Sequence, residues 1–331
     1  MAKVLVTGGA GFIGSHVVDA YVEAGHQVTV VDNLESGLIH HLSPDARFYQ
    51  MDILDPSLES IFAEERPQVV NHHAAQASIS RSIADPLQDA RINILGSVHL
   101  LELARKYHIP HFIFASSGGA VYGHQRCYPA SEDHPLNPVN AYGIAKLTVE
   151  KYLEYYWKAH QIRCVSFRYS NVYGPRQNPH GEAGVVAIFI GAFLQGKCPV
   201  IYGDGQQTRD FVHVRDVVRA NVLSLDLLLR GNDAWVPESM ALNIATERET
   251  SILEIQNQLA SILGGSGECQ FDSPREGEIR RSVLACGQAE RVLNWKPSLS
   301  LEEGLRETAT WFLSQDIRVA NRGSKMENRN D

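Results

Sequence analysis

Short apolar runs alternate with longer amphipathic segments through the first half of the chain. Residues 4–6 form an apolar run, and residues 12–24 follow with apolar side chains at helical spacing. A run that is apolar on both faces is typical of a strand buried inside a parallel sheet. Further strand-length runs lie at 27–31, 47–51, 68–72, 111–115 and 163–168, and helical spacing recurs at 56–65, 89–107 and 141–160.

This alternation predicts an α/β fold whose core is a doubly wound parallel sheet with right-handed crossovers. The pattern breaks after Arg176, so we expect residues 1–176 to form one domain and 177–213 with 247–314 to form a smaller α/β domain. Residues 214–246 read as a helix and a strand that return to the first domain. The chain turns polar at residue 315, and we expect 315–331 to be a flexible tail.

Three glycines separate the first predicted strand from the first predicted helix. Gly8, Gly11 and Gly14 follow one another at three-residue spacing. Glycine permits the tight turn, lets the backbone approach a pyrophosphate closely, and lets the helix pack closely on the strand. The free N–H groups at the helix start then face the phosphates. Strand, glycine turn and helix together predict a Rossmann-type dinucleotide-binding site.

An acidic residue ends the second predicted strand. Asp32 lies 18 residues after Gly14, near the position where an acidic side chain accepts hydrogen bonds from the adenosine ribose. A carboxylate there repels the 2′-phosphate of NADP, and residues 33–37 contain no arginine to bind that phosphate. The sequence therefore favours NAD.

Tyr142 and Lys146 are four residues apart on a predicted helix and so share one face. An ammonium beside a phenol favours the phenolate, and the positive charge of a bound NAD⁺ ring would add to this effect. We expect the pair to lower the pKa of Tyr142 and to make it a usable acid and base. Either Ser116 or Ser117, at the end of the fifth predicted strand, supplies a hydroxyl beside it, and Ser117 is the better placed.

Composition narrows the function classes. The formal net charge is −8, which argues against a nucleic-acid surface. No apolar run is long enough to span a membrane, and we expect no signal peptide. The five cysteines are scattered, which fits the cytoplasm and argues against a cysteine-based metal site. The histidines show no metal-ligand spacing, so we expect no bound metal.

Together, the motifs give the chain a family resemblance from its start to about residue 312. It resembles an extended short-chain dehydrogenase/reductase, and within that group it is similar to the prokaryotic UDP-glucose (UDP-galactose) 4-epimerases. The motifs that carry the resemblance are TGGAGFIGSH (7–16), VDN (31–33), MDILD (51–55), HHAAQAS (72–78), FASSGGAVYG (114–123), YGIAK (142–146), FRYSNVYGPRQ (167–177), PHGEAGVVAIF (179–189), YGDGQQTRDFVHVRDV (202–217) and PREGEIRRS (274–282).

The resemblance implies an NAD site in the first domain. It assigns the pyrophosphate, the adenosine ribose, the adenine, the middle of the cofactor and the nicotinamide end to successive groups of residues. In that order these are Gly8, Gly11, Phe12 and Ile13; Asp32, Asn33, Ser36 and Gly37; Asp52 and Ile53; Ala74, Ala75 and Gln76; and Asn93, Tyr142, Lys146 and Tyr169.

The resemblance also implies a UDP-sugar substrate, a homodimer built on helices 89–107 and 141–160, and a place in galactose metabolism. Ser117, Tyr142 and Lys146 would be catalytic: Tyr142 takes the proton of the sugar 4-hydroxyl while a hydride leaves C4 for NAD⁺. The hydride then returns to the other face of the 4-keto sugar. The implied substrate-binding residues are Ser117, Tyr142, Asn171, Gly184, Val185, Val186, Tyr202, Arg209, Arg275 and Glu278.

Two departures from related sequences refine this hypothesis. Many epimerases carry a third Ser or Thr where this chain has Gly118, so the hydroxyl must come from Ser117. Related dehydratases and decarboxylases carry acidic residues just before the VYG motif, whereas this chain has Gly118, Gly119 and Ala120. Elimination is therefore disfavoured, and oxidation and reduction at C4 remain. A UDP-glucuronate 4-epimerase or an NAD-dependent sugar-nucleotide dehydrogenase would share the same motifs.

A small residue at the implied sugar pocket predicts a wider substrate range. Ser282 lies four residues after Glu278, where the family places a gatekeeper beside the 2-position of the sugar. Some relatives have Tyr at this position. The smaller serine predicts that N-acetylated UDP-sugars are also accepted.

Overall fold

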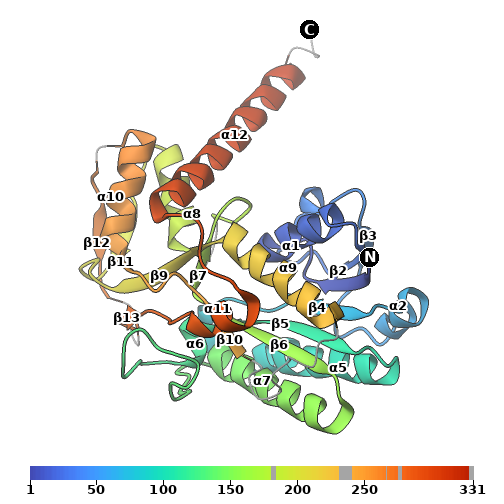
Figure 1. The fold of residues 1–331 in the computed structure, drawn as a ribbon. Coiled ribbons are helices and arrows are strands. Elements are labelled where there is room, and N and C mark those ends of the chain that lie inside the picture. Colours follow the sequence, from blue (N-terminus) through green and yellow to red (C-terminus); the bar gives the residue numbers. More distant parts are fainter. Residues whose placement is uncertain (180–183, 231–240, 266, 275–277, 328–331) are drawn as a thin grey trace.

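The computed structural model describes residues 1–179, 184–230, 241–265, 267–274 and 278–327, with residues 316–327 described by their backbone only. Its centre is a seven-stranded sheet in the order β10-β6-β5-β4-β1-β2-β3, in which every neighbouring pair is parallel. This is the predicted doubly wound sheet (Figure 1). Its strands are β1 (Lys3–Thr7), β2 (Gln27–Asp32), β3 (Arg47–Gln50), β4 (Val69–His72), β5 (His111–Ser117), β6 (Arg163–Tyr169) and β10 (Ala241–Ile244).

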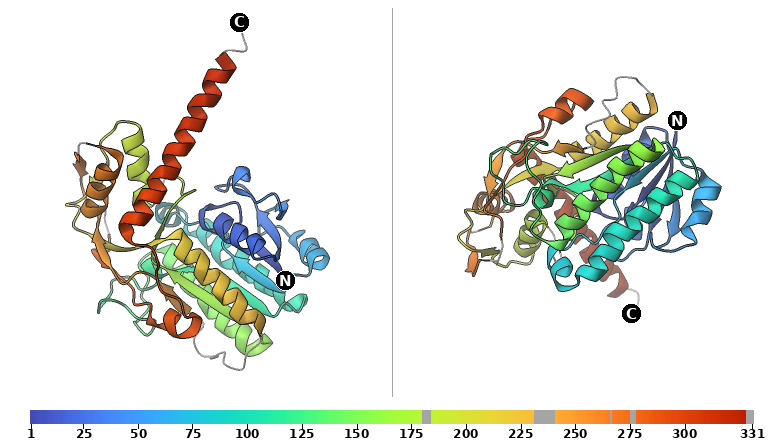
Figure 2. Two further views of the ribbon diagram at one scale, coloured as in Figure 1. Left: turned by 45° about the horizontal axis from the view of Figure 1, so that its top comes forward. Right: turned by 90° about the horizontal axis from the view of Figure 1, so that it is seen from below.

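Helices cover both faces of this sheet (Figures 1 and 2). Successive side chains of a strand point to opposite faces of the sheet, so both faces are apolar and need a cover. In β1, Val4 and Val6 point into one hydrophobic cluster, and Leu5 between them points into another. The first cluster contains side chains of α1 (Phe12–Glu23), α9 (Val214–Arg230) and α11 (Gly287–Leu293). The second contains side chains of α2 (Leu58–Glu65), α5 (Gly96–Lys106) and α7 (Ala141–His160).

The helix predicted over residues 89–107 starts earlier in the structure, at Pro86, and contains a π-helical turn. Asp85 ends α3 (Ile79–Ala84), and its side chain accepts the N–H of Gln88 to cap α4 (Pro86–Ala90). Proline is tolerated in a first helical turn but not in a helix interior, so Pro86 marks a new start. A π-helical turn, η2 (Arg91–Leu95), then joins α4 to α5. This turn carries Asn93, and π-turns of this kind are frequent at functional sites.

The second half of the chain builds a smaller α/β unit beside the carboxyl edge of the sheet (Figure 2). Its core packs α8, α10 and α12 on short strands. Strand β9 pairs with β7, β11 and β13, and β8 pairs with β12. The elements are β7 (Asn171–Tyr173), α8 (Val185–Leu194), β8 (Val200–Tyr202), β9 (Thr208–His213), β11 (Glu249–Ser251), α10 (Ile252–Leu263), β12 (Gln270–Asp272), β13 (Arg281–Ser282) and α12 (Leu301–Glu327).

Helix α12 is longer than the sequence pattern indicates. Its backbone continues to Glu327, through much of the segment expected to be a tail, and it projects away from the body of the protein (Figure 1). None of the helices in the described part of the chain is long and apolar enough to cross a membrane.

A buried carboxylate joins the two units. Asp210 on β9 accepts hydrogen bonds from the backbone N–H groups of Thr246 (2.8 Å) and Glu247 (3.0 Å), which follow β10. The Ser170 hydroxyl, just after β6, donates to the same side chain at 3.3 Å. Burial raises the pKa of Asp210 to about 6, against the effect of these hydrogen bonds. The ends of β6 and β10 are thereby tied to the strand that carries Arg209.

Candidate active site

The glycine turn after β1 leaves no space for side chains. A Cβ atom on Gly8, which has a φ of +68°, would lie 2.5 Å from the backbone N of Ala74. A Cβ atom on Gly14 would lie 2.2 Å from the carbonyl oxygen of Gly8. The turn therefore packs directly on the segment after β4 and on α1. Because Gly11 is the N-cap of α1 and has no side chain, the first-turn N–H groups of Phe12 and Ile13 suit a phosphate ligand.

Asp32 fixes this turn from the end of β2. Its carboxylate accepts the N–H of Ala10 at 2.9 Å and the N–H of Leu34 at 2.8 Å. Each oxygen retains capacity for a further hydrogen bond, as ribose hydroxyls require. Gly37 packs against the carboxylate, since a Cβ there would lie 2.8 Å from Oδ1. The glycine cradle and this acidic residue fit a dinucleotide with an unphosphorylated ribose.

The expected adenine and central cofactor residues lie along the same edge of the sheet. Asn33 Nδ2 donates to Asp52 Oδ2 at 2.8 Å, which joins the ends of β2 and β3. The side chain of Ile53 is buried in the core beside Gly96, so only its backbone is open to a ligand. The remaining expected residues on this edge are the exposed Ser36 after β2 and the partly buried Ala74 and Ala75 after β4.

Ser117, Tyr142 and Lys146 meet at the end of β5. Asn140 caps α7 by accepting the N–H of Gly143 at 2.8 Å, and this places Tyr142 and Lys146 in the first turns of the helix. Lys146 Nζ donates to the carbonyl of Ala115 at 2.8 Å and lies 5.6 Å from the centre of the Tyr142 ring. The Ser117 hydroxyl lies next to the Tyr142 phenol and lowers its pKa.

Ser116 points away from this group. Its hydroxyl donates to Glu150 Oε1 at 2.5 Å, and Glu150 forms a buried ion pair with Arg168 at 2.7 Å. The structure therefore brings Ser117, and not Ser116, to Tyr142. The alternation of side chains along β5 separates the two serines.

The protein alone does not lower the pKa of Tyr142 as the sequence analysis expects. Burial raises the pKa to about 12, although the neighbouring Ser117 hydroxyl lowers it. Burial lowers the pKa of Lys146 to about 8, against the negative charges of Asp89 and Glu150. Lys146 also directs its ammonium to the Ala115 carbonyl. The resting tyrosine is therefore a neutral phenol.

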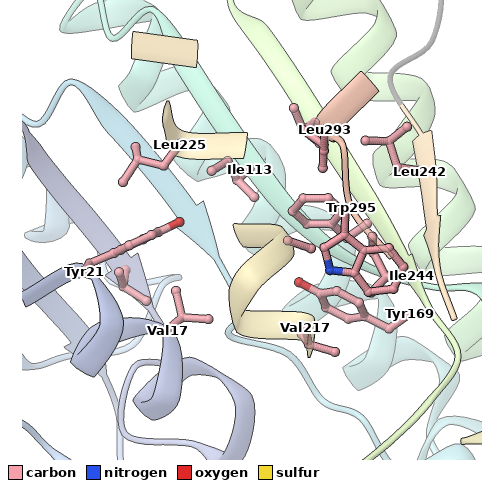
Figure 3. Close-up of a cluster of buried hydrophobic side chains, with 14 of the residues drawn as sticks. Val17, Tyr21, Ile113, Tyr169, Val217, Leu225, Leu242, Ile244, Leu293 and Trp295 are labelled. Atoms are coloured by element: carbon pink, nitrogen blue, oxygen red, sulfur yellow. The ribbon is translucent and has the colours of Figure 1, made fainter. Parts of the chain in front are cut away.

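Two expected site residues have their side chains elsewhere. Tyr169 is buried in the core between the sheet and α9, where its hydroxyl accepts a hydrogen bond from Asn221 Nδ2 at 2.8 Å. Figure 3 shows it among Val217, Ile244 and Trp295. Val186 is likewise buried in the core of the smaller unit. Both residues sit at element ends near the expected site, but their side chains face inward. Arg275 lies outside the described residues.

The remaining expected substrate residues lie on the smaller unit and at its junction with the sheet. Arg209 on β9 forms an ion pair with Glu278 at 3.2 Å, and burial lowers the pKa of its guanidinium. Gln207 donates to the Tyr202 carbonyl at 2.8 Å and to Glu278 at 3.5 Å, which draws these residues together. Asn171 lies opposite Gly119, and Gly184 with Val185 begins α8.

Leu284 packs on Gly118 beside the site, a contact that the sequence does not reveal. A Cβ atom on Gly118 would lie 2.3 Å from Leu284 Cδ1. The glycine that stands where many epimerases carry a hydroxyl is thus matched by a fully buried leucine from the segment after β13. The signal is a long-range contact between residues 118 and 284, which no local pattern indicates.

Comparisons with known proteins agree with this geometry. Residues 4–236 match the model of the NAD-dependent epimerase/dehydratase family. The chain therefore belongs to this family. The UDP-glucose 4-epimerase of Mycolicibacterium smegmatis is 42% identical over 315 residues, which are 94% of this chain and 98% of that protein.

Two solved structures share the whole fold. A Thermotoga maritima UDP-glucose 4-epimerase crystallised with UDP-glucose is similar at a TM-score of 0.90 and 45% identity, covering 95% of this chain and 99% of that chain. A Methanobrevibacter ruminantium UDP-N-acetylglucosamine 4-epimerase in complex with UDP-N-acetylmuramic acid has a TM-score of 0.87 and 35% identity, with 95% and 99% coverage.

The contact between Gly118 and Leu284 predicts an energetic coupling. Gly118→Ala should lower the free energy of unfolding by about 1–3 kcal/mol, because the buried Leu284 cannot move aside freely. Leu284→Ala opens that space at a cost of its own, so the double variant should lose less than the sum of the two single losses. Urea unfolding of all four proteins measures this difference. Gly119→Ala is the matched control, since its Cβ would meet only Asn171 Oδ1 at 4.0 Å. Additive losses would contradict the contact.

Proposed function

We propose that this protein inverts C4 of a UDP-sugar through a transient 4-keto sugar, with NAD as its resident cofactor. The observation that carries the proposal is the meeting of Ser117, Tyr142 and Lys146 at the sheet edge that also carries the glycine cradle. The names of the relatives support the same reaction class: two are UDP-glucose 4-epimerases and one is a UDP-N-acetylglucosamine 4-epimerase. Interconversion of UDP-glucose and UDP-galactose would place the enzyme in galactose metabolism.

Each unit would hold one ligand. NAD would bind to the first domain, residues 1–176 together with 214–246. The UDP-sugar would bind to the smaller domain, residues 177–213 and 247–314. When bound, NAD supplies a reversible two-electron oxidation of a carbon that bears a hydroxyl group. The residues that would hold it are the pyrophosphate cradle Gly8, Gly11, Phe12 and Ile13; Asp32, Asn33, Ser36 and Gly37 at the ribose; Asp52 and Ile53 at the adenine; and Ala74, Ala75, Gln76, Asn93 and Lys146 further along.

Tyr142 would hold the proton that leaves and returns to the sugar 4-oxygen. Ser117 lies next to the phenol and can orient the same sugar hydroxyl. Because the resting phenol has a pKa of about 12, it needs positive charge nearby to act as a base. Lys146 supplies one such charge. In the return direction Tyr142 gives the proton back to the 4-oxygen, so the enzyme ends each cycle unchanged.

The diphosphate would bind to Arg209. This guanidinium is paired with Glu278 in the structure. A diphosphate has more charge and suits the planar fork of arginine, so it would displace the carboxylate. Glu278 would then be free to accept a ribose hydroxyl. Around them, Gly184, Val185, Tyr202 and the backbone of Val186 would surround the uracil, and Asn171 would contact the sugar nucleotide.

The turn before the VYG motif favours plain oxidation and reduction. Gly118, Gly119 and Ala120 form α6 (Gly118–Val121) and provide no carboxylate beside Tyr142. Elimination of water needs a base at a neighbouring carbon, which these residues cannot supply. Inversion at C4 is therefore favoured over dehydration.

A second copy of the chain would cover an exposed apolar surface, which we define as Ile83, Leu87, Leu95, Ile144 and Tyr155. Leu87 is 83% exposed and Leu95 is 59% exposed. The surface lies on α3, α4, η2 and α7, which pack side by side. Apolar residues in such numbers on adjoining elements mark an interface, and we propose a homodimer. All five cysteines are free, which fits a reducing cytoplasm.

Removal of one hydroxyl tests the catalytic assignment. Tyr142→Phe should lower the conversion of UDP-galactose to UDP-glucose, assayed without added NAD, by at least about a hundredfold, because no group replaces the phenol as acid and base. The variant should still fold and retain NAD after purification. Tyr152→Phe, which alters a solvent-facing tyrosine on the same helix, is the control. Near-normal turnover by Tyr142→Phe would overturn the assignment.

The sugar range depends on Ser282, which is buried at the end of β13. The wild-type protein should convert UDP-N-acetylglucosamine as well as UDP-glucose, because a serine leaves room at the 2-position. Ser282→Tyr should lose the N-acetylated sugar while it retains UDP-glucose. Chromatography of the products after incubation with each UDP-sugar, including UDP-glucuronate, shows which sugars are converted. Turnover of UDP-glucose alone by the wild type would refute this prediction.

Charges on the apolar surface should separate the dimer. Leu87→Lys with Leu95→Lys should raise the dissociation constant at least about a hundredfold, since burial of each leucine stabilises an interface by about 1.5–3 kcal/mol. Light scattering during size-exclusion chromatography measures the mass. Phe271→Lys changes an equally apolar residue on β12, 58% exposed, and should leave the dimer intact. A wild-type monomer, or a double variant that remains dimeric, would contradict the proposed interface.

A further inference from the structure

A buried carboxylate beside the site has no role in the mechanism above. Asp89 on α4 is 2% exposed. Its Oδ1 accepts two hydrogen bonds, from Gln76 Nε2 and from Asn93 Nδ2, each at 2.9 Å. Both donors are neutral amides, which leave the charge of a carboxylate uncompensated. A buried charge of this kind is costly unless an opposite charge is near.

The two amides hold the carboxylate in a fixed position. Asn93 Nδ2 also donates to the Gln76 carbonyl, and Asn93 Oδ1 accepts the Gln76 N–H, both at 2.9 Å. Asn93 lies in the π-turn η2, four residues after Asp89, and Gln76 lies in the segment after β4. Helix, π-turn and strand end thus form one closed network around Asp89 Oδ1.

The opposite charge is on the facing helix. Helix α4 packs against α7, which carries Lys146. Lys146 is 3% exposed, and its ammonium donates to the Ala115 carbonyl and lies 4.8 Å from the centre of the Phe114 ring. Neither Asp89 nor Lys146 forms an ion pair within 4.0 Å among the described residues. Two buried opposite charges on packed helices interact strongly, because little water screens them.

The other charged and titratable groups around Asp89 and Lys146 are paired, neutral or exposed to solvent. Glu150 on α7 is bound by Arg168 and by the Ser116 hydroxyl, so its charge is compensated. Burial lowers the pKa of His72 at the end of β4 and of His73 just after it, and these rings are therefore neutral. On the elements next to α4, Arg81 is paired with Glu35 and Arg91 is exposed. Tyr142 is a neutral phenol in the resting protein. Of the described residues on the elements packed against α7, Asp89 is the buried carboxylate that no cation binds, and its charge favours the ammonium form of Lys146.

We propose that Asp89 is a positioning residue for the catalytic pair: its carboxylate, held by Gln76 and Asn93, is the counter-charge that keeps the Lys146 ammonium protonated in the buried site. This inference rests on the proposed role of Lys146 beside Tyr142. Asp89 touches neither the sugar nor the phenol, and it acts through Lys146.

The direction of the effect follows from the charges. Burial lowers the pKa of Lys146 to about 8, and Asp89 opposes that shift by favouring the ammonium. Removal of the carboxylate should lower the pKa of Lys146 further. Lys146 would then lose its proton at a lower pH, and its free amine would become more reactive near neutrality.

Asp89→Asn is the direct test, because an Asn oxygen can accept both hydrogen bonds that Asp89 Oδ1 now accepts. The alkaline limb of the pH profile of epimerisation should move to lower pH by about one unit, while the protein stays folded. Acetylation of Lys146 by an activated ester, followed across pH by mass spectrometry in the protein as purified, should show its half-maximal rate at a pH lower by the same amount. Asp85→Asn, which removes an exposed charge and keeps a good helix cap, should change neither profile.

The acetylation profile separates this inference from the proposed function. A protein without epimerase activity would refute the proposed function, and the Lys146 profile would still test Asp89. A folded Asp89→Asn variant with both profiles unchanged, or with a loss of activity that is uniform across pH, would overturn the counter-charge role. If Asp89→Asn does not fold, Asp89→Ser removes the same charge and must show the same shift.

Discussion

The close contact between the end of β1 and its neighbours constrains the rest of this molecule. The carbonyl of Gly8 and the Cα of Gly14 approach so closely that any side chain at residue 14 would overlap the backbone. Helix α1 can therefore start directly at the carboxyl edge of the sheet, where its N–H groups are available. Asp32 ties the same turn to β2, and Ala74 ties it to β4. The dinucleotide site is a consequence of how tightly three strand ends and one helix pack.

Buried charge is the second constraint, and it acts at the end of β5. Lys146, Glu150 and Arg168 are all nearly inaccessible to water, and so is Asp89. Glu150 and Arg168 neutralise each other and hold Ser116, which leaves Ser117 for Tyr142. Lys146 keeps its charge in a site where burial favours its loss. A cofactor and a sugar that enter this site meet a phenol, a hydroxyl and an ammonium that are already in place.

Local patterns predict most of the sheet and its helices, because buried parallel strands and amphipathic helices have distinct periodicities. Helix α7 and the glycine turn match the sequence expectation closely. The placement of Tyr142 and Lys146 on one helix therefore matches it as well. The π-turn at Asn93 could not be predicted from the sequence, since its apolar spacing resembles that of a continuous helix. The inward direction of the Tyr169 side chain could not be predicted, because a side chain at a strand end can face the core or the edge, and sequence does not distinguish them.

Long-range contacts are the part that local sequence could not supply. Leu284 packs against Gly118, although the two residues are separated by more than half of the chain. The counter-charge at Asp89 depends on the packing of α4 against α7. In each case a residue that looks ordinary in its own segment acquires its role from a distant partner. The pKa of Tyr142 is a further example, since burial outweighs the neighbouring lysine in the protein alone.

The central claim is that the hydrogen taken from C4 returns to C4 of the same sugar. Incubation of the purified protein, without added NAD, with UDP-galactose that carries deuterium at C4 tests this claim most directly. The account predicts UDP-glucose that retains the deuterium at C4, with no accumulation of NADH. Loss of the label to solvent, release of labelled NADH, or a dehydrated product would contradict it.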